Sequence, residues 1–134
     1  MTVGLDTSVL LRLLLGKPAA EARVARERLE AAHERGETIL VTDLAMAETY
    51  FALHYHYGVA KADARASLRA MATSRVVTLS PPEAIWALES STGAGLVDRL
   101  IHARHRASGA TSWTFDRKMA ALEGVVRIQA SGET

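Results

Sequence analysis

Four acidic side chains each lie where an apolar segment meets a turn or a helix. They are Asp6, Glu48, Asp98 and Asp116. The loops at the carboxyl ends of strands are where α/β proteins gather their ligand-binding groups. Carboxylate oxygens are the ligands that hard divalent cations such as Mg²⁺ and Mn²⁺ prefer. The four positions therefore predict one acidic pocket that holds a metal ion.

Four carboxylates in one pocket would repel one another strongly. Two unit charges about 5 Å apart repel by roughly 3 kcal/mol at an effective dielectric constant of about 20, and four acids contain several such pairs. A bound divalent cation removes this repulsion. With a phosphodiester as the substrate, the cation would also lower the pKa of a bound water and neutralise charge on the phosphoryl oxygens. The expected chemistry is hydrolysis of that phosphodiester.

Each acid taken alone has a simpler explanation. An Asp that follows a strand is more often a helix cap or a turn residue than a metal ligand. Thr7 and Ser8 come directly after Asp6. Their hydroxyls could cap the following helix, or they could hydrogen-bond a carboxylate or a bound water. The sequence leaves both roles open.

Five short apolar runs predict the strands that would position these acids. Each run is rich in β-forming residues and is bounded by polar residues or glycine. The runs are Thr2 to Leu5, Thr38 to Val41, Val76 to Leu79, Ala110 to Thr114 and Val125 to Ile128. Longer segments with helical spacing of apolar residues lie between them. This alternation predicts an α/β fold, with a central parallel sheet of about five short strands and helices on both faces.

Local signals predict where several helices begin and end. Thr42 is a natural N-cap for the helix that carries Glu48, and Gly36 and Gly58 would close two helices with a positive φ. The sequence Ser-Pro-Pro-Glu at 80–83 predicts a capping box, with a proline at the first helical position.

The composition limits the possible classes of protein. The chain has 134 residues, and we expect residues 1–134 to form a single domain with a frayed tail at 129–134. It contains no cysteine, which excludes disulfides, thiolate metal sites and thiol nucleophiles. The net charge of +1 gives no global sign of nucleic-acid binding. No leader-like segment or long apolar run occurs, so we expect a soluble, cytoplasmic protein that does not enter membranes.

Four segments of the chain together resemble the PIN-domain family, in particular its VapC-type toxin ribonucleases. They are residues 5–11 (LDTSVLL), 47–49 (AET), 97–101 (VDRLI) and 114–118 (TFDRK). The order and spacing of all four acids agree with that family over nearly the whole chain. The resemblance implies a parallel-sheet α/β fold and Mg²⁺- or Mn²⁺-dependent endonucleolytic cleavage of RNA. It also implies a homodimer that is inhibited by a cognate antitoxin with a DNA-binding segment.

The resemblance also assigns a role to each matching residue. Asp6 and Asp98 would be the principal metal ligands. Glu48 would bind the metal through water or assist in activating the water, and Asp116 would complete the acidic rim. Supporting positions around these carboxylates would be taken by Thr7, Ser8 and Thr114.

One position departs from the family pattern. Many members carry another acid three residues before the third carboxylate, whereas this chain has Gly95 three residues before Asp98. A missing carboxylate weakens a second metal position, so we expect one tightly bound ion.

Basic residues and a histidine lie close in sequence to the last two acids. Arg99, Arg117 and Lys118 could contact the phosphates of RNA, or they could belong to a solvated helix face. His102 lies four residues after Asp98, so it could reach the scissile phosphate or form a simple surface pair with that acid. The sequence leaves these alternatives open.

Two other functions are compatible with acids at strand ends. One is a phosphotransfer domain with Asp6 as the acceptor, as in response regulators or haloacid dehalogenases. It fits less well, because haloacid dehalogenases need a second Asp where this chain has Ser8. The other is a non-catalytic module whose carboxylates bind a partner's arginines. We favour the metal-dependent endoribonuclease.

Overall fold

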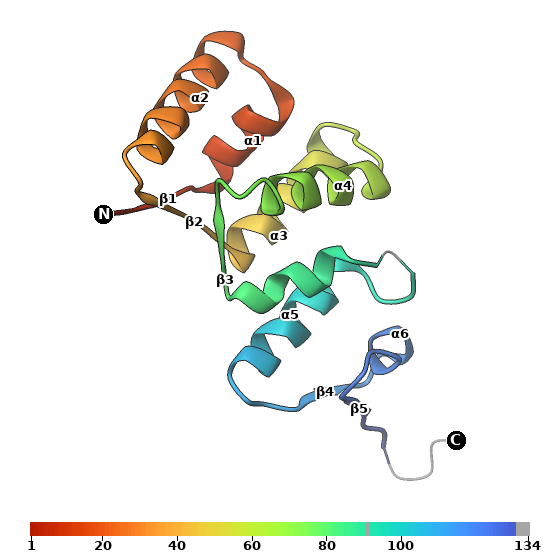
Figure 1. Ribbon diagram of the computed structural model, residues 1–134. Coiled ribbons are helices and arrows are strands. Elements are labelled where there is room, and N and C mark those ends of the chain that lie inside the picture. The colour runs from red at the N-terminus through yellow and green to blue at the C-terminus, as the bar shows by residue number, and fades with distance from the viewer. Residues whose placement is uncertain (91, 131–134) are drawn as a thin grey trace. The chain divides into compact units, whose positions relative to one another are not determined.

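All five strands predicted from the apolar runs form, and every strand pairing is parallel (Figure 1). The strands are β1 Thr2–Gly4, β2 Thr38–Thr42, β3 Thr78–Ser80, β4 Ser112–Thr114 and β5 Val125–Arg127. The computed structural model describes residues 1–90 and 92–130, so residues 131–134 of the predicted tail lie outside it. The chain divides into two compact units, Met1–Ser80 and Pro81–Thr134.

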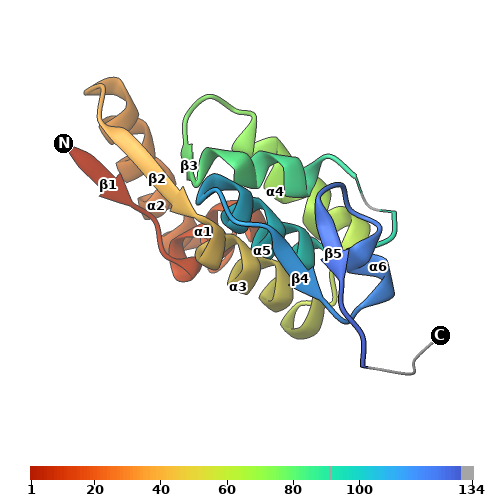
Figure 2. The same cartoon turned by 90° about the horizontal axis from the view of Figure 1, so that it is seen from below.

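The first unit is built on a three-stranded sheet in the order β1-β2-β3. Thr2 of β1 lies opposite Thr38 of β2, and Figure 2 shows these two strands side by side. The central strand β2 is the most buried, since Ile39 is 1% exposed and Val41 is 0% exposed. The sheet therefore has its apolar centre at β2, as expected for a parallel sheet covered by helices.

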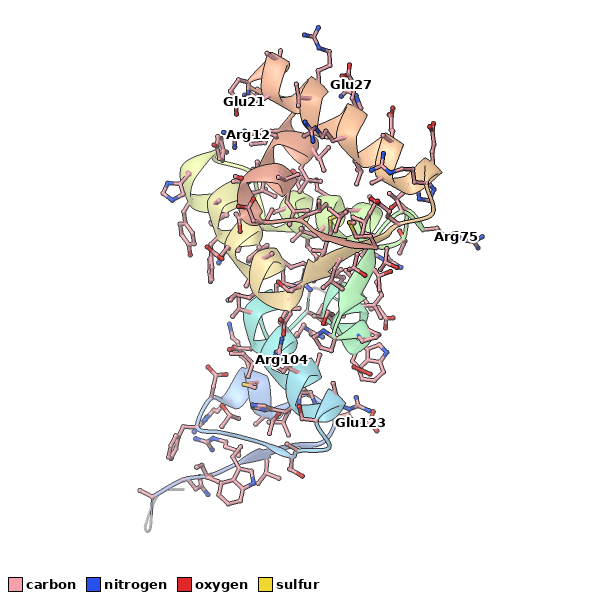
Figure 3. The ribbon with its side chains drawn as sticks, turned by 90° about the vertical axis from the view of Figure 1, so that its left-hand side faces the viewer. Arg12, Glu21, Glu27, Arg75, Arg104 and Glu123 are labelled. Atoms are coloured by element: carbon pink, nitrogen blue, oxygen red, sulfur yellow. The ribbon has the colours of Figure 1, made fainter. Side chains whose placement is uncertain are left out.

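Four α-helices accompany this sheet. They are α1 Thr7–Leu15, α2 Ala19–Glu34, α3 Asp43–Phe51 and α4 Lys61–Ala72. Helix α1 packs on α2 and α3, and α3 packs on α4. Leu10 of α1, Met46 of α3 and Leu68 of α4 are fully buried and supply the apolar core of the unit. At the surface, Arg12 of α1 forms an ion pair with Glu21 of α2 (Figure 3).

The predicted boundaries of the helices are confirmed at three places. Thr42 caps α3, because its Oγ1 accepts a hydrogen bond of 3.1 Å from the Ala45 N–H. Helix α3 continues into a π-helical turn, η1 Ala52–His56, before Gly58 ends it at φ +66°. Gly36 follows α2 at φ +73°. Both glycines thus adopt the left-handed conformation that other residues rarely tolerate.

In its described residues, 81–90 and 92–130, the second unit combines a two-stranded sheet of β4 and β5 with three helical segments. The segments are the 3₁₀-helix η2 Pro82–Leu88, α5 Leu96–Ala107 and α6 Arg117–Ala120. Helix α5 packs on η2 through buried side chains that include Leu88, Leu96 and Leu100. The predicted α/β class with parallel strands is thus confirmed, with three strands in one sheet and two in the other.

The predicted capping box at 80–83 is wrong. Ser80 belongs to β3, and η2 begins at Pro82 with Pro81 as its N-cap and no side-chain cap. Pro81 has neither a side-chain acceptor nor a backbone N–H, and a capping box requires both. The carboxylate of Glu83 accordingly has an oxygen, Oε2, that is buried without a hydrogen-bond partner.

None of the helices within residues 1–90 and 92–130 has both the length and the apolar character that crossing a bilayer requires. The 16-residue helix α2 illustrates this, because its sequence is rich in Arg and Glu.

Removing the hydroxyl of Thr42 tests the cap that starts α3. We expect Thr42→Ala to lower the free energy of unfolding by about 1 kcal/mol, because the Ala45 N–H loses its acceptor. Thr42→Ser keeps the hydroxyl and is expected to retain most of that stability. Urea denaturation followed by circular dichroism measures the difference, and equal stability of the alanine and serine variants would contradict the capping role.

Candidate active site

Asp6 lies at the junction between β1 and α1 and is the N-cap of that helix. Its Oδ1 accepts hydrogen bonds from the Ser8 hydroxyl at 2.6 Å and from the Val9 N–H at 3.2 Å. Both bonds favour the charged form and hold the pKa of Asp6 below its usual value, with the Ser8 hydroxyl as the largest cause. Asp6 is also exposed. It is therefore an ionised, accessible carboxylate that can receive a cation.

A shared pocket brings Glu48 of α3 to Asp6. The pocket has a volume of about 310 Å³ and is open to solvent. Its lining comes from the ends of β1 and β2 and the starts of α1 and α3, namely Gly4, Leu5, Asp6, Thr7, Thr42, Leu44, Ala45 and Glu48. Glu48 is exposed rather than turned into the core, so it needs no buried partner. The first unit thus brings two predicted site acids and Thr7 together.

Asp98 lies in the first turn of α5, in the second unit. A carboxylate in the first turn is stabilised by the partial positive charge of the helix N-terminus. The N-cap of this helix is Gly95, which supplies no side-chain acceptor. The first turn of α5 thus carries one carboxylate, that of Asp98.

Asp116 joins β4 to α6 in the same way that Asp6 joins β1 to α1. Its Oδ1 accepts a hydrogen bond of 2.9 Å from the Met119 N–H and caps α6. Its own N–H donates to Thr114 Oγ1 at 3.0 Å, so Thr114 orients the backbone at this acid. Thr114 thus contacts the backbone of Asp116, and its supporting role at a metal site stays a prediction.

Both aspartates that follow strands therefore act as helix caps, the simpler role that the sequence left open. The capping bonds of Asp6 and of Asp116 end on Oδ1 in each case. The other oxygen, Oδ2, can then face a ligand. A cap also fixes the direction of the carboxylate, which is what a metal ligand needs from its surroundings. Capping and metal binding are compatible at both positions.

The donor atoms of the four acids fit a hard divalent cation. Carboxylate oxygens with nearby Thr and Ser hydroxyls are the chemistry that Mg²⁺ and Mn²⁺ prefer. Within residues 1–90 and 92–130, no group of three or more Asp, Glu or His side chains is placed to hold a metal ion. Asp6 and Glu48 belong to the first unit and Asp98 and Asp116 to the second. The convergence of all four acids stays a prediction.

The three basic candidates differ in how their side chains are used. Arg99 folds back on the loop before α5, where its Nε donates to the Ala94 carbonyl at 2.9 Å and its guanidinium also bonds to Thr92. The side chains of Arg117 and Lys118 are exposed and make no ion pair or hydrogen bond within the described part of the chain. They are therefore free to contact an anion, whereas Arg99 also organises a loop.

His102 is neither a surface partner of Asp98 nor a free base. It is 7% exposed, with Nδ1 at 2.6 Å from Ser112 Oγ and Nε2 at 2.7 Å from the Glu123 carbonyl oxygen. His105 reaches the same Ser112 hydroxyl at 2.8 Å. The sequence did not predict this cluster; its one signal was two histidines three residues apart on one face of a helix.

Comparison with known protein families gives one match that covers most of the chain. The family model described as PIN domain matches residues 3–125. This range includes all four acids. Searches of curated proteins and of solved structures give no match.

Removing the Ser8 hydroxyl tests the electrostatics at Asp6. In Ser8→Ala the pKa of Asp6 is expected to rise toward its usual value, because the largest stabilising bond to the carboxylate is lost. The lowered pKa in the wild type contributes stability above the ordinary Asp value, about pH 4, which is lost as the pH falls through the folded value. The variant should therefore lose less stability on acidification.

An NMR titration of the Asp6 carboxyl carbon measures this pKa directly. Ser8→Thr is the matched control, because it keeps a hydroxyl at the same position and should keep the pKa low. An alanine variant whose Asp6 titrates as in the wild type would contradict the assigned cause.

Proposed function

The chain belongs to the PIN-domain family, and from that membership we propose that it is a metal-dependent endoribonuclease of the VapC type, the toxin of a type II toxin–antitoxin pair. Members of this family are generally nucleases, so the coarser activity is hydrolysis of nucleic acid. The observation that best supports the proposal is the open pocket where two parallel strands end, lined by both Asp6 and Glu48.

In this proposal residues 1–134 form one domain whose four acids share a pocket. Asp6 and Asp98 would hold Mg²⁺ or Mn²⁺, with Glu48 and Asp116 beside them. When bound, the ion lowers the pKa of a water and neutralises charge that develops on the phosphoryl oxygens. The cation also removes the repulsion that the clustered carboxylates would otherwise suffer.

The remaining residues of the site orient these groups and bind the substrate. The Ser8 hydroxyl lowers the pKa of Asp6 and fixes the direction of its carboxylate. Thr114 holds the backbone of Asp116. Arg117 and Lys118 follow that acid and would pair with RNA phosphates on either side of the scissile bond, which positions the strand without reading its sequence.

Regulation by a cognate antitoxin is part of the same proposal. A basic side chain of the antitoxin would enter the acidic pocket and replace the charge of the cation. The antitoxin segment would dock in an apolar groove of about 640 Å³ between β1, α1 and α2, which has Val9, Val24 and Leu29 in its lining. Arg28 also lines this groove, so a carboxylate on the docked segment would find a partner. The toxin would act as a cytoplasmic homodimer.

Asparagine and alanine variants of the capping aspartates separate the metal role from the cap. Asn caps a helix about as well as Asp, whereas Ala costs about 1 kcal/mol. We therefore expect Asp6→Asn and Asp116→Asn to keep their stability but lose at least about 100-fold in cleavage rate, since each removes a charge beside the metal. Asp6→Ala would lose both stability and activity.

The measurement is cleavage of structured RNA by purified protein with Mg²⁺ or Mn²⁺, and with a chelator as the metal-free control. If the asparagine variants cleave as fast as the wild type, Asp6 and Asp116 serve only as helix caps and do not bind the metal. A stable phosphate adduct on Asp6, detected by intact mass after incubation with a small phosphodonor, would favour phosphotransfer instead. Equal activity with and without the chelator would contradict the metal dependence.

Gly95 offers a gain-of-function test at the start of α5. It has φ −69°, and the space that a Cβ would occupy there is open, so a larger residue fits without strain. We expect Gly95→Asp to lower the Mn²⁺ concentration for half-maximal cleavage about fivefold, because a further charge near the cation contributes on the order of 1 kcal/mol. Gly95→Asn is the matched control, since it caps the helix equally but adds no charge. Equal metal dependence of the two variants would contradict a metal position beside Asp98.

A further inference from the structure

A buried hydrogen-bond network joins α5 to the segment that carries Asp116. His102 bonds to Ser112 at the start of β4 and to the Glu123 carbonyl in the turn before β5. His105 bonds to the same hydroxyl. Ser112 is completely buried and His102 is 7% exposed. Buried polar groups that are all bonded in this way specify one arrangement of the elements they join.

The direction of each hydrogen bond follows from the chemistry of the partners. The Glu123 carbonyl only accepts, so His102 Nε2 carries the hydrogen and donates. When the ring carries this single N–H, Nδ1 accepts from the Ser112 hydroxyl. That oxygen still has lone pairs, and His105 Nδ1–H donates to it. The chain of bonds is thus satisfied from His105 through Ser112 and His102 to the backbone of Glu123.

The two partners of His102 enclose the acid that the proposed function uses. Ser112 lies four residues before Asp116 and Glu123 lies seven residues after it. The segment between them contains Thr114 and the exposed bases at 117–118. One imidazole therefore ties both ends of this segment to α5.

Helix α5 also carries Asp98, on the same face as the network. Positions 98, 102 and 105 are spaced by four and seven residues and so lie along one side of the helix. Asp98 is about 6 Å before His102 along the axis, at about 1.5 Å per residue.

The chain reverses after α5 and brings β4 back along it. Gly109 adopts φ +73°, and the Ala110 N–H bonds to the His105 carbonyl at 2.8 Å. From Ser112 to Asp116 an extended chain covers at most about 13 Å. Ser112 lies at the level of the two histidines, so Asp116 lies within that distance of them along the chain.

We propose that His102 is a positioning residue which, through Ser112 and the Glu123 carbonyl, sets the place of Asp116 relative to Asp98. The inference rests on the proposed function, because it gives those two acids a common metal. His102 does not act as a general base, since both ring nitrogens are engaged within the fold.

The experiment compares His102→Leu, which loses both bonds, with Ser112→Ala, which loses only the link to β4. His33→Leu is the matched control, because His33 is exposed on α2. Each variant is assayed below its melting temperature, for RNA cleavage as a function of Mn²⁺ and for Mn²⁺ binding by electron paramagnetic resonance. Hydrogen exchange of the Met119 N–H, which donates to Asp116 Oδ1, reports the place of that acid without any need for activity.

We expect His102→Leu and Ser112→Ala each to raise the Mn²⁺ concentration for half-saturation by about tenfold, the low end for residues that orient metal ligands. The double variant should be no worse than His102→Leu, since both changes break one network. The Met119 N–H should exchange faster in His102→Leu, while His33→Leu should match the wild type.

Three results would overturn the proposal. The first is unchanged Mn²⁺ dependence and unchanged Met119 exchange in folded His102→Leu. The second is loss of cleavage in His102→Leu alone, with full activity in Ser112→Ala, as for a catalytic base. The third is strict additivity in the double variant. If the wild type neither binds Mn²⁺ nor cleaves RNA, the proposed function fails, and Met119 exchange still decides whether His102 positions Asp116.

Discussion

The capping of a helix by the carboxylate that ends a strand is the interaction on which the rest of the structure depends. At Asp6, Oδ1 accepts from the Val9 N–H, which starts α1, and also from the Ser8 hydroxyl; at Asp116, Oδ1 accepts from the Met119 N–H, which starts α6. A cap supplies hydrogen bonds to the charged form of the acid, so it orients the side chain and favours its ionisation. The local fold thereby lowers the pKa of Asp6 at the end of β1 and orients the carboxylates of both Asp6 and Asp116, before any cation is considered.

The sequence predicted those parts of the fold that depend on local chemistry. The five apolar runs became five strands, Thr42 capped α3, and Gly36 and Gly58 ended helices with positive φ. The capping box failed for an equally local reason, because proline at 81 cannot donate. The π-helical turn at 52–56 carries no such signal in the sequence. It is the last turn before Gly58 ends the helix, so no helical residues follow in which a shift of the apolar spacing could be seen.

For the candidate site, the sequence indicated the positions of the acids but not the hydrogen bonds around His102. The positions of the acids at strand ends and helix starts follow from the pattern, and the pocket shared by Asp6 and Glu48 agrees with it. The network around His102 did not follow, because a histidine on a helix reveals nothing about a serine ten residues later until the chain folds back. Gly95, by contrast, was visible in the sequence, because it departs from the family pattern. The structure shows that a Cβ at this position would meet no other atom within 4 Å, so a larger side chain would fit there.

The central claim of the proposed function is that Asp6 and Asp98 hold a single divalent ion. It is tested most directly by a double-mutant cycle on Mn²⁺ affinity with Asp6→Asn, Asp98→Asn and the double variant. The account predicts that each single change weakens binding and that the double change departs from their sum by more than about 0.5 kcal/mol, as for residues that share a partner. Affinities that add within that margin, or Mn²⁺ binding that is unaffected by either change, would contradict it.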